Sequence, residues 1–314
     1  MTRRVLAPLA ALALVVSASA QVTFSFNYLD SGTGFNDVTL GATRRSALES
    51  AASTLASYFS VPSARTVTFD VTSHSTNNTN LASAGSTVSG ITVDGFYKTN
   101  AQKMIQDNAG PGDGQINWNF FHAWDYDDSV GAGSYDFKSV AMHEMIHALG
   151  FFSFVSGSET GAFDEPSGNT DVWSIFDQFL TDASGTRLVT SGAAFNTSLA
   201  GIIANASGAA GDVYFNGTNA VATFGGVVPI YSPATFADGS SLSHLSTTFF
   251  GTNNYIMTHA VTTGPSVRAL SALELAILSD LGYSVTAVPE PATYAALAGC
   301  LALVVAVRRR RAAA

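Results

Sequence analysis

The feature that most constrains this chain is a pair of histidines four positions apart, in the pentapeptide His143-Glu144-Met145-Ile146-His147. Residues at positions i and i+4 lie on the same face of an α-helix, so both imidazole rings can reach a single metal ion. Asp136 precedes the surrounding segment and Gly150 follows it, and these residue types are typical of a helix start and a helix end. The sequence therefore predicts a helix over residues 139–149 that carries two metal-ligating histidines.

Glu144 directly follows the first of these histidines. Zinc favours imidazole ligands, and a catalytic zinc site keeps one position open for a water molecule. Bound zinc lowers the pKa of that water to about 7, and a neighbouring carboxylate can then accept its proton. The pattern predicts one catalytic Zn²⁺ ion with Glu144 as the general base. The alternative is a helix with two unrelated surface histidines.

The third zinc ligand is less evident from the motif alone. Many zinc proteases of the metzincin clan have the longer motif HExxHxxGxxH, and this chain has Gly150 but places Ser153 where the third histidine would stand. Serine is a poor zinc ligand, so the third ligand has to come from elsewhere. His244 and His259 are the candidates far downstream.

Three downstream segments, together with HEMIHALGF, resemble the leishmanolysin family of metzincins. They are Ser243–Leu245, Ile256–Thr258 and the stretch 270–283, which ends in Asp-Leu-Gly-Tyr. The resemblance implies a zinc endopeptidase with the metal on His143, His147 and His244, Glu144 as general base, and a Met turn at Met257 beneath the metal. His259 is the alternative third ligand, or a residue that lines the substrate cleft or donates a hydrogen bond to the transition-state oxyanion. Met257 is alternatively core filler. The chain lacks the disulfides and the cysteine-bearing propeptide of the eukaryotic members.

The pattern of apolar residues predicts an α+β fold. Strands are expected over 22–29, 65–71 and 115–121, a helix over 46–59 that starts in a capping box of Ser46 and Glu49, and a final helix over 272–281 with a capping box of Ser271 and Glu274. With the resemblance, this order implies a zincin-like domain of two lobes, with a mixed sheet and the active-site helix in an N-lobe over about 21–155. An irregular C-lobe over about 156–287 would end in the last helix. The strand over 115–121 is predicted to be the sheet edge that pairs with an extended substrate.

The two ends of the chain read as sorting segments. Residues 1–20 have two arginines, an apolar run and Ala18-Ser19-Ala20, the pattern of a secretory signal peptide. Residues 288–314 have Pro289-Glu290-Pro291, a short apolar run and four arginines, which resembles a PEP-CTERM sorting signal. The resemblance implies an exosortase as partner and removal of the tail; a permanent membrane anchor is the alternative. The protein is therefore expected to be exported to the cell surface or beyond, with membrane contact only through the tail.

The net charge of the chain excludes one class of binding partner. The whole chain carries a net charge of −9, and the terminal segments contribute +5 of positive charge, so the region between them carries −14. Such a surface repels nucleic acid, which excludes it as an expected partner. Asp125, Asp127 and Asp128 are interpreted as a solvated acidic loop, and a calcium site built from their carboxylate oxygens is the alternative.

These observations leave three functional hypotheses. The favoured one is an exported zinc endopeptidase acting on proteins or peptides. The second is a surface or extracellular-matrix binding protein that keeps the fold with little peptidase activity, and the third is a zinc hydrolase of non-peptide amides.

Overall fold

The computed structural model describes residues 21–88, 95–160, 172–192, 194–199, 201–203 and 212–286. The predicted signal peptide and the predicted sorting tail lie outside the described residues. Among the residues that are described, no helix is long and apolar enough to span a bilayer.

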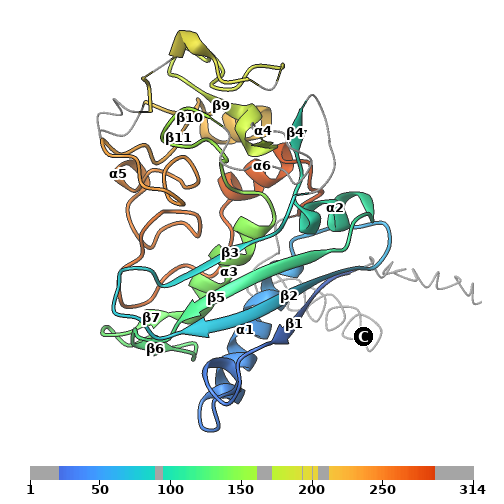
Figure 1. Ribbon diagram of the computed structural model, residues 1–314, viewed down its shortest axis with the longest axis vertical. Helices are drawn as coiled ribbons and strands as arrows, with labels where there is room; N and C mark the ends of the chain where they lie inside the picture. The colour runs from blue at the N-terminus through green and yellow to red at the C-terminus, as the bar shows by residue number, and fades with distance from the viewer. Residues whose placement is uncertain are drawn as a thin grey trace, which may run out of the picture.

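A four-stranded sheet forms the lower half of the molecule in Figure 1, with the order β1-β2-β5-β3. The strands are β1 (Val22–Tyr28), β2 (Arg65–His74), β5 (Asp113–Asn119) and β3 (Ala82–Gly85). The first three run parallel, and β3 runs antiparallel to β5. The three strands predicted from alternation are thus confirmed, since every second residue of β2 from Val67 to Val71 is fully buried.

β5 does not form the edge of this sheet, so the prediction for strand 115–121 is wrong. It lies between β2 and β3, with Ile116 opposite Val71 on one side and Ala84 on the other. The edge strand next to β5 is β3, and β1 forms the other edge. The β3 sequence Ala-Ser-Ala-Gly has neither the alternation nor the β-branched residues that mark a strand.

Two helices pack beside each other against this sheet. Helix α1 (Gly41–Ala56) contacts β1, and helix α3 (Phe137–Ala148) contacts β3 and β5. The helix predicted over 139–149 is confirmed with small shifts at its ends. A core of aromatic rings joins α3 to the sheet, with the ring centroids of Trp118 and Phe137 4.1 Å apart.

Helix α1 begins five residues before the predicted start, and the predicted capping box is wrong. Asp37 accepts backbone hydrogen bonds from Thr39 and Leu40 ahead of the helix, while Glu49 accepts one from the hydroxyl of Tyr28. The side chains expected to cap a helix at Ser46 therefore lie within it.

The chain after α3 builds the upper part of the molecule in Figure 1 from short elements. Two short parallel strand pairs lie outside the main sheet. They are β6 (Trp124–Asp125) with β7 (Tyr135–Asp136), both before α3 in the sequence, and β4 (Phe96–Tyr97) with β8 (Trp173–Ser174), one before and one after it. The remaining elements are η1 (Gly34–Asn36), α2 (Asn100–Asp107), η2 (Phe176–Phe179), β9 (Leu180–Thr181), η3 (Thr197–Leu199), β10 (Tyr214–Phe215), α4 (Thr218–Phe224), β11 (Val228–Pro229), α5 (Thr247–Phe250) and α6 (Ala272–Asp280).

Helix α6 confirms the last predicted helix and its cap. The Ser271 hydroxyl accepts a hydrogen bond from the Glu274 backbone, and the Glu274 carboxylate accepts one from the Ser271 backbone. With its strands and helices in these arrangements, the described chain belongs to the α+β class.

Candidate metal centre

Helix α3 holds the HExxH residues in place through defined ends. Asp136 caps its first turn by accepting a hydrogen bond from the Ser139 backbone, as predicted. Gly150 follows the helix with a φ of +93°, a conformation that favours glycine. One helix turn between these ends carries both His143 and His147 on the face toward the C-terminal part of the chain.

The structure brings His143, His147 and His244 together. Their Nε2 atoms form a triangle with sides of 2.9, 3.0 and 3.2 Å. His244 arrives from a loop almost one hundred residues downstream in sequence, and it is only 4% exposed. Among the described residues, this is the group of histidines and carboxylates close enough to share an ion.

Each of the three rings is held at its other nitrogen by a backbone carbonyl. The Nδ1 atoms of His143, His147 and His244 lie 2.6, 2.8 and 2.8 Å from the carbonyl oxygens of Ile256, Phe151 and Ser240. A carbonyl only accepts hydrogen bonds, so each Nδ1 carries the proton and donates it. The three Nε2 lone pairs therefore point at one another.

Burial keeps these rings neutral. It lowers the pKa of His143 to about 4 and that of His147 to about 3, and it lowers the pKa of His244 as well. Mutual repulsion adds to the shift at His147 and His244. Neutral imidazoles are the form that binds metal.

Three converging lone pairs repel one another unless a cation lies among them. Imidazole nitrogens lie about 2.0–2.1 Å from a bound zinc ion, and the spacing of the three Nε2 atoms would allow one ion to contact all of them. The three rings thus form a group able to hold a metal ion.

Glu144 lies beside this group on the wall formed by β3. It is only 6% exposed, and burial raises the pKa of its carboxyl to about 8, while a hydrogen bond from the Ala84 backbone acts in the opposite direction. A cation at the three histidines would favour the charged carboxylate. The side chain is thus placed to exchange a proton with a group bound at the metal position.

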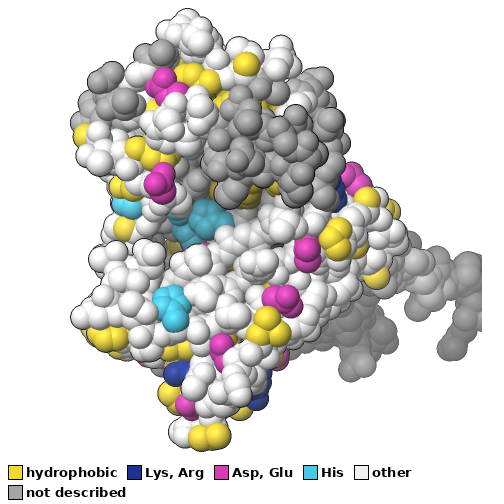
Figure 2. All heavy atoms as spheres, in the orientation of Figure 1, with side chains coloured by type: hydrophobic (Ala, Val, Ile, Leu, Met, Phe, Trp, Pro, Cys, Tyr) yellow, Lys and Arg dark blue, Asp and Glu magenta, His cyan; other side chains and the backbone are white. Residues whose placement is uncertain are grey.

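The histidines lie in a cleft of about 1000 Å³. Its walls come from β3, α3 and the segments 152–156, 236–244 and 253–261. Figure 2 shows this hollow between the sheet part below and the C-terminal part above, with histidine side chains inside it. The three histidines thus line the cleft together with Glu144.

His259 and Ser153 line the cleft without joining the group. The His259 ring centroid is 6.5 Å from that of His244, and its Nδ1 is 3.0 Å from the Thr247 hydroxyl. Ser153 sits where the extended motif has histidine, and its backbone N–H donates to the Ser243 hydroxyl beside His244. The residue at the usual ligand position therefore supports the neighbour of the distant histidine.

Met257 is fully buried in the loop next to the group. Its neighbour Ile256 supplies the carbonyl that holds His143, and its own carbonyl accepts a hydrogen bond from Leu245, which follows His244. The backbone around Met257 thus connects His143 to the segment of His244 through hydrogen bonds. The Met257 side chain belongs to the main apolar core.

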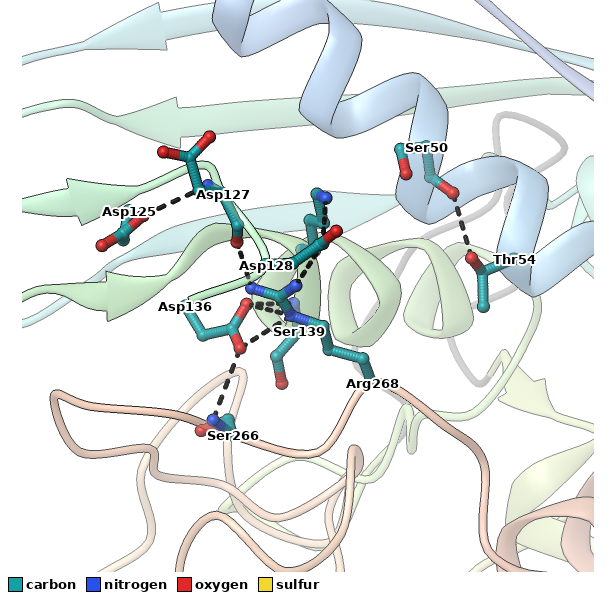
Figure 3. Close-up of polar contacts among 10 residues, drawn as sticks. Ser50, Thr54, Asp125, Asp127, Asp128, Asp136, Ser139, Ser266 and Arg268 are labelled. Atoms are coloured by element: carbon teal, nitrogen blue, oxygen red, sulfur yellow. Dashed lines mark hydrogen bonds and ion pairs between the residues drawn. The ribbon is translucent and has the colours of Figure 1, made fainter. Parts of the chain in front are cut away.

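Among the described residues, the three aspartates considered for calcium form no group whose carboxylates could share an ion. Figure 3 shows Asp125 and Asp127 joined within their own loop, while Asp128 faces Arg268. Asp125 also accepts from the Gly131 backbone, and Asp128 pairs with Lys138 as well. The carboxylates of Asp125 and Asp128 are thus already engaged by backbone donors and by cations, respectively.

Two carboxylates that hold the backbone near the cleft were not predicted in this role from the sequence. Glu274 was expected only as a helix cap, yet its other oxygen accepts the Met257 backbone N–H at 2.8 Å. Asp177 is fully buried and accepts the backbone N–H groups of Phe154 and Ser174 beneath the cleft wall. Both residues are acidic side chains within otherwise apolar segments of the sequence, and this pattern could have indicated a buried role.

Comparison with models of known protein families finds no match, and neither does comparison with characterised proteins. The function of this chain is therefore inferred from its own residues.

Proposed function

We propose that this protein is an exported zinc-dependent endopeptidase, with a metzincin fold of the leishmanolysin type. The observation that carries the proposal is the convergence of three neutral histidine Nε2 atoms beside the buried carboxyl of Glu144. A structural metal site has no use for a general base, whereas hydrolysis requires one. Zinc is the proposed metal because three imidazoles with an open side are typical of catalytic zinc.

The free edge of β3 is the proposed track for the substrate backbone. Ser83 and Gly85 alternate with Ala82 and Ala84 along the strand, and the Ala84 N–H faces Glu144 rather than β5. Because the Ala84 N–H is engaged by Glu144, the Ala82 N–H and the carbonyls of Ala82 and Ala84 would remain for an extended peptide, which would add as a further strand. This pairing would carry the scissile bond past the three histidines.

Bound zinc would polarise the scissile carbonyl and lower the pKa of the attacking water. Glu144 accepts a proton from that water as the oxygen adds to the carbonyl carbon. The carbon–nitrogen bond then breaks, and Glu144 returns the proton to the leaving amine. Burial of Glu144 in the cleft keeps bulk water from competing for this proton.

Metal content and peptide cleavage of four proteins test the proposal: wild type, Glu144→Gln, His244→Ala and the control His74→Ala. Wild type is expected to hold one zinc ion and cleave casein. Glu144→Gln should keep the zinc and lose at least about 10³-fold in kcat, because the proton acceptor is gone. His244→Ala should lose most of the zinc, and His74→Ala, whose side chain lies outside the cleft, should change neither property.

The second candidate is a surface or matrix binding protein, favoured by the low fraction of charged residues and the Ser- and Thr-rich composition. It predicts zinc binding without cleavage of any protein, peptide or non-peptide amide. Normal cleavage by Glu144→Gln would refute the general-base mechanism. Full zinc affinity in His244→Ala would refute the proposed ligand set.

A further inference from the structure

His259 lines the same cleft as Glu144 and is fixed there by two contacts. Its ring stacks on Tyr231 with the centroids 3.5 Å apart and the planes within 8°. Its Nδ1 lies 3.0 Å from the Thr247 hydroxyl. A histidine on an ordinary loop would have neither a parallel aromatic support nor a fixed ring nitrogen.

The supports of His259 are themselves tied to the metal group. The Tyr231 backbone N–H donates to the His244 carbonyl at 2.8 Å. Leu245 pairs with Thr258, the residue before His259, and its N–H donates to Met257. The position of the His259 ring is therefore set relative to His244 from two sides.

This arrangement separates His259 from the ligands in both distance and orientation. Its centroid is 6.5 Å from that of His244 and the planes are inclined at 74°. His259 therefore lies next to the metal group without being part of it, and it lines the same cleft. Glu144 and β3 line this cleft as well, so a peptide paired with β3 would bring its scissile carbonyl into the space that His259 borders.

We propose that His259 is a catalytic residue that donates a hydrogen bond from Nε2 to the scissile carbonyl oxygen as that oxygen gains negative charge. The inference rests on the proposed peptidase function. When the Thr247 hydroxyl donates to Nδ1, the ring proton resides on Nε2, the nitrogen left for the cleft. The proton stays on His259 throughout, so the ring stabilises charge without any transfer.

A neutral ring suffices for this role. Burial lowers the pKa of His259, which keeps the imidazole uncharged at neutral pH. The donor is held in place before the reaction, and such preorganised donors account for large rate effects in hydrolases. Tyr231 and Thr247 act as positioning residues because they hold the ring without reaching the substrate.

The test compares wild type with His259→Phe and His259→Gln in the full zinc-loaded protein. Phe keeps the aromatic stack on Tyr231 and removes the donor, while Gln restores an N–H donor on a shorter side chain. The matched control is His74→Phe, which replaces a histidine of β2 outside the cleft. Four quantities are measured: zinc per chain, kcat, KM for a fluorogenic peptide, and the Kd of a phosphinic peptide that mimics the tetrahedral state.

His259→Phe is expected to keep one zinc per chain and a KM within about 3-fold, while kcat falls about 10²–10³-fold. The phosphinic peptide should bind more weakly by a similar factor, because its oxygens take the place of the developing oxyanion. His259→Gln should recover part of both losses, and His74→Phe should match wild type.

Other outcomes overturn the inference. A His259→Phe protein with kcat and phosphinic-peptide affinity within about 3-fold of wild type shows that no donor acts there. Loss of zinc in this variant makes His259 a ligand instead. A zinc-loaded wild type that cleaves no peptide refutes the proposed function itself, a result distinct from an active wild type with an equally active His259→Phe.

Discussion

The guanidinium of Arg268 binds the carboxylate of Asp136 through Nε, which lies 2.9 Å from both carboxylate oxygens. Asp136 is the cap of helix α3, and Arg268 comes from the segment that leads into α6 (Figure 3). This contact joins the start of the helix that carries His143 and His147 to the C-terminal part of the chain. The relative position of the two cleft walls thus depends in part on one buried ion pair.

Replacement of Arg268 by Ala should destabilise the protein by about 2–4 kcal/mol, because the Asp136 carboxylate is only 1% exposed and loses its cation. Urea unfolding measures this loss. The control is Lys138→Ala, since its partner Asp128 is 89% exposed and the pair should be worth less than about 1 kcal/mol. Equal losses in the two variants would refute the role assigned to Arg268.

Glu274 should affect metal binding although it contacts no ligand. One oxygen accepts the Met257 N–H, the other accepts the Ser271 backbone N–H and hydroxyl, and the neighbouring Ile256 carbonyl holds His143. Glu274→Ala should cost about 2–4 kcal/mol, because three donors lose a buried acceptor, and should weaken zinc binding by about 10-fold or more.

The matched control for Glu274 is Glu49→Ala. Glu49 is exposed and accepts a single hydrogen bond from Tyr28 at 3.1 Å, so its loss should cost less than about 0.5 kcal/mol. Thermal unfolding and zinc titration of both variants decide the matter. Unchanged zinc affinity in Glu274→Ala would show that the loop holds His143 without this support.

Asp177 should make stability depend on pH. Burial raises the pKa of its carboxyl to about 6 from an ordinary value of 3.8, which corresponds to about 3 kcal/mol. The folded protein holds this proton more tightly than the unfolded chain. The contribution is therefore fully present below about pH 4 and is lost as the pH rises through 6.

The difference in unfolding free energy between wild type and Asp177→Asn isolates this effect, since Asn does not titrate. Wild type should have its greatest advantage at pH 4 and should lose about 3 kcal/mol of it by pH 7. Urea unfolding at intervals of one pH unit measures the difference. A difference that stays constant with pH would show that the carboxyl does not titrate in this range.

The cleft should disfavour acidic substrates. Among its described lining residues there is no Lys or Arg, whereas Glu144 and Asp238 contribute carboxyl groups. Peptides with Asp or Glu beside the scissile bond should be cleaved with at least about 10-fold lower kcat/KM than their Asn or Gln counterparts.

Added salt and the variant Asp238→Asn should both reduce this discrimination, because they screen or remove the repelling charge. Asp212→Asn, outside the cleft lining, is the control for net charge. Efficient cleavage beside acidic residues at low salt would show that the local field does not govern selection.

The parts of the fold that sequence could predict are those with local causes. The cap at Asp136 and the capping box of Ser271 and Glu274 depend on residues within one helix turn, and both are present. The alternation of Val67, Phe69 and Val71 marks a strand with a buried face.

The errors arose where position depends on distant partners. β3 consists of small residues and becomes a strand because β5 offers it backbone partners, so the wrong strand was expected at the edge. Of the candidate site, spacing within one helix indicated His143 and His147, whereas His244 was indicated only by resemblance. The carbonyls of Ile256, Phe151 and Ser240 belong to the backbone and leave no trace in residue type.

The long separation between His147 and His244 makes the metal group a long-range cross-link. The two residues are 97 positions apart in sequence, and their Nε2 atoms are 3.0 Å apart in space. An ion that bridges them closes a large loop, and closure of such a loop removes much of the freedom of the unfolded chain. A chain emerging from synthesis or export cannot assemble the triad before its last third has folded, so under the proposed function activity would arise only in the finished molecule.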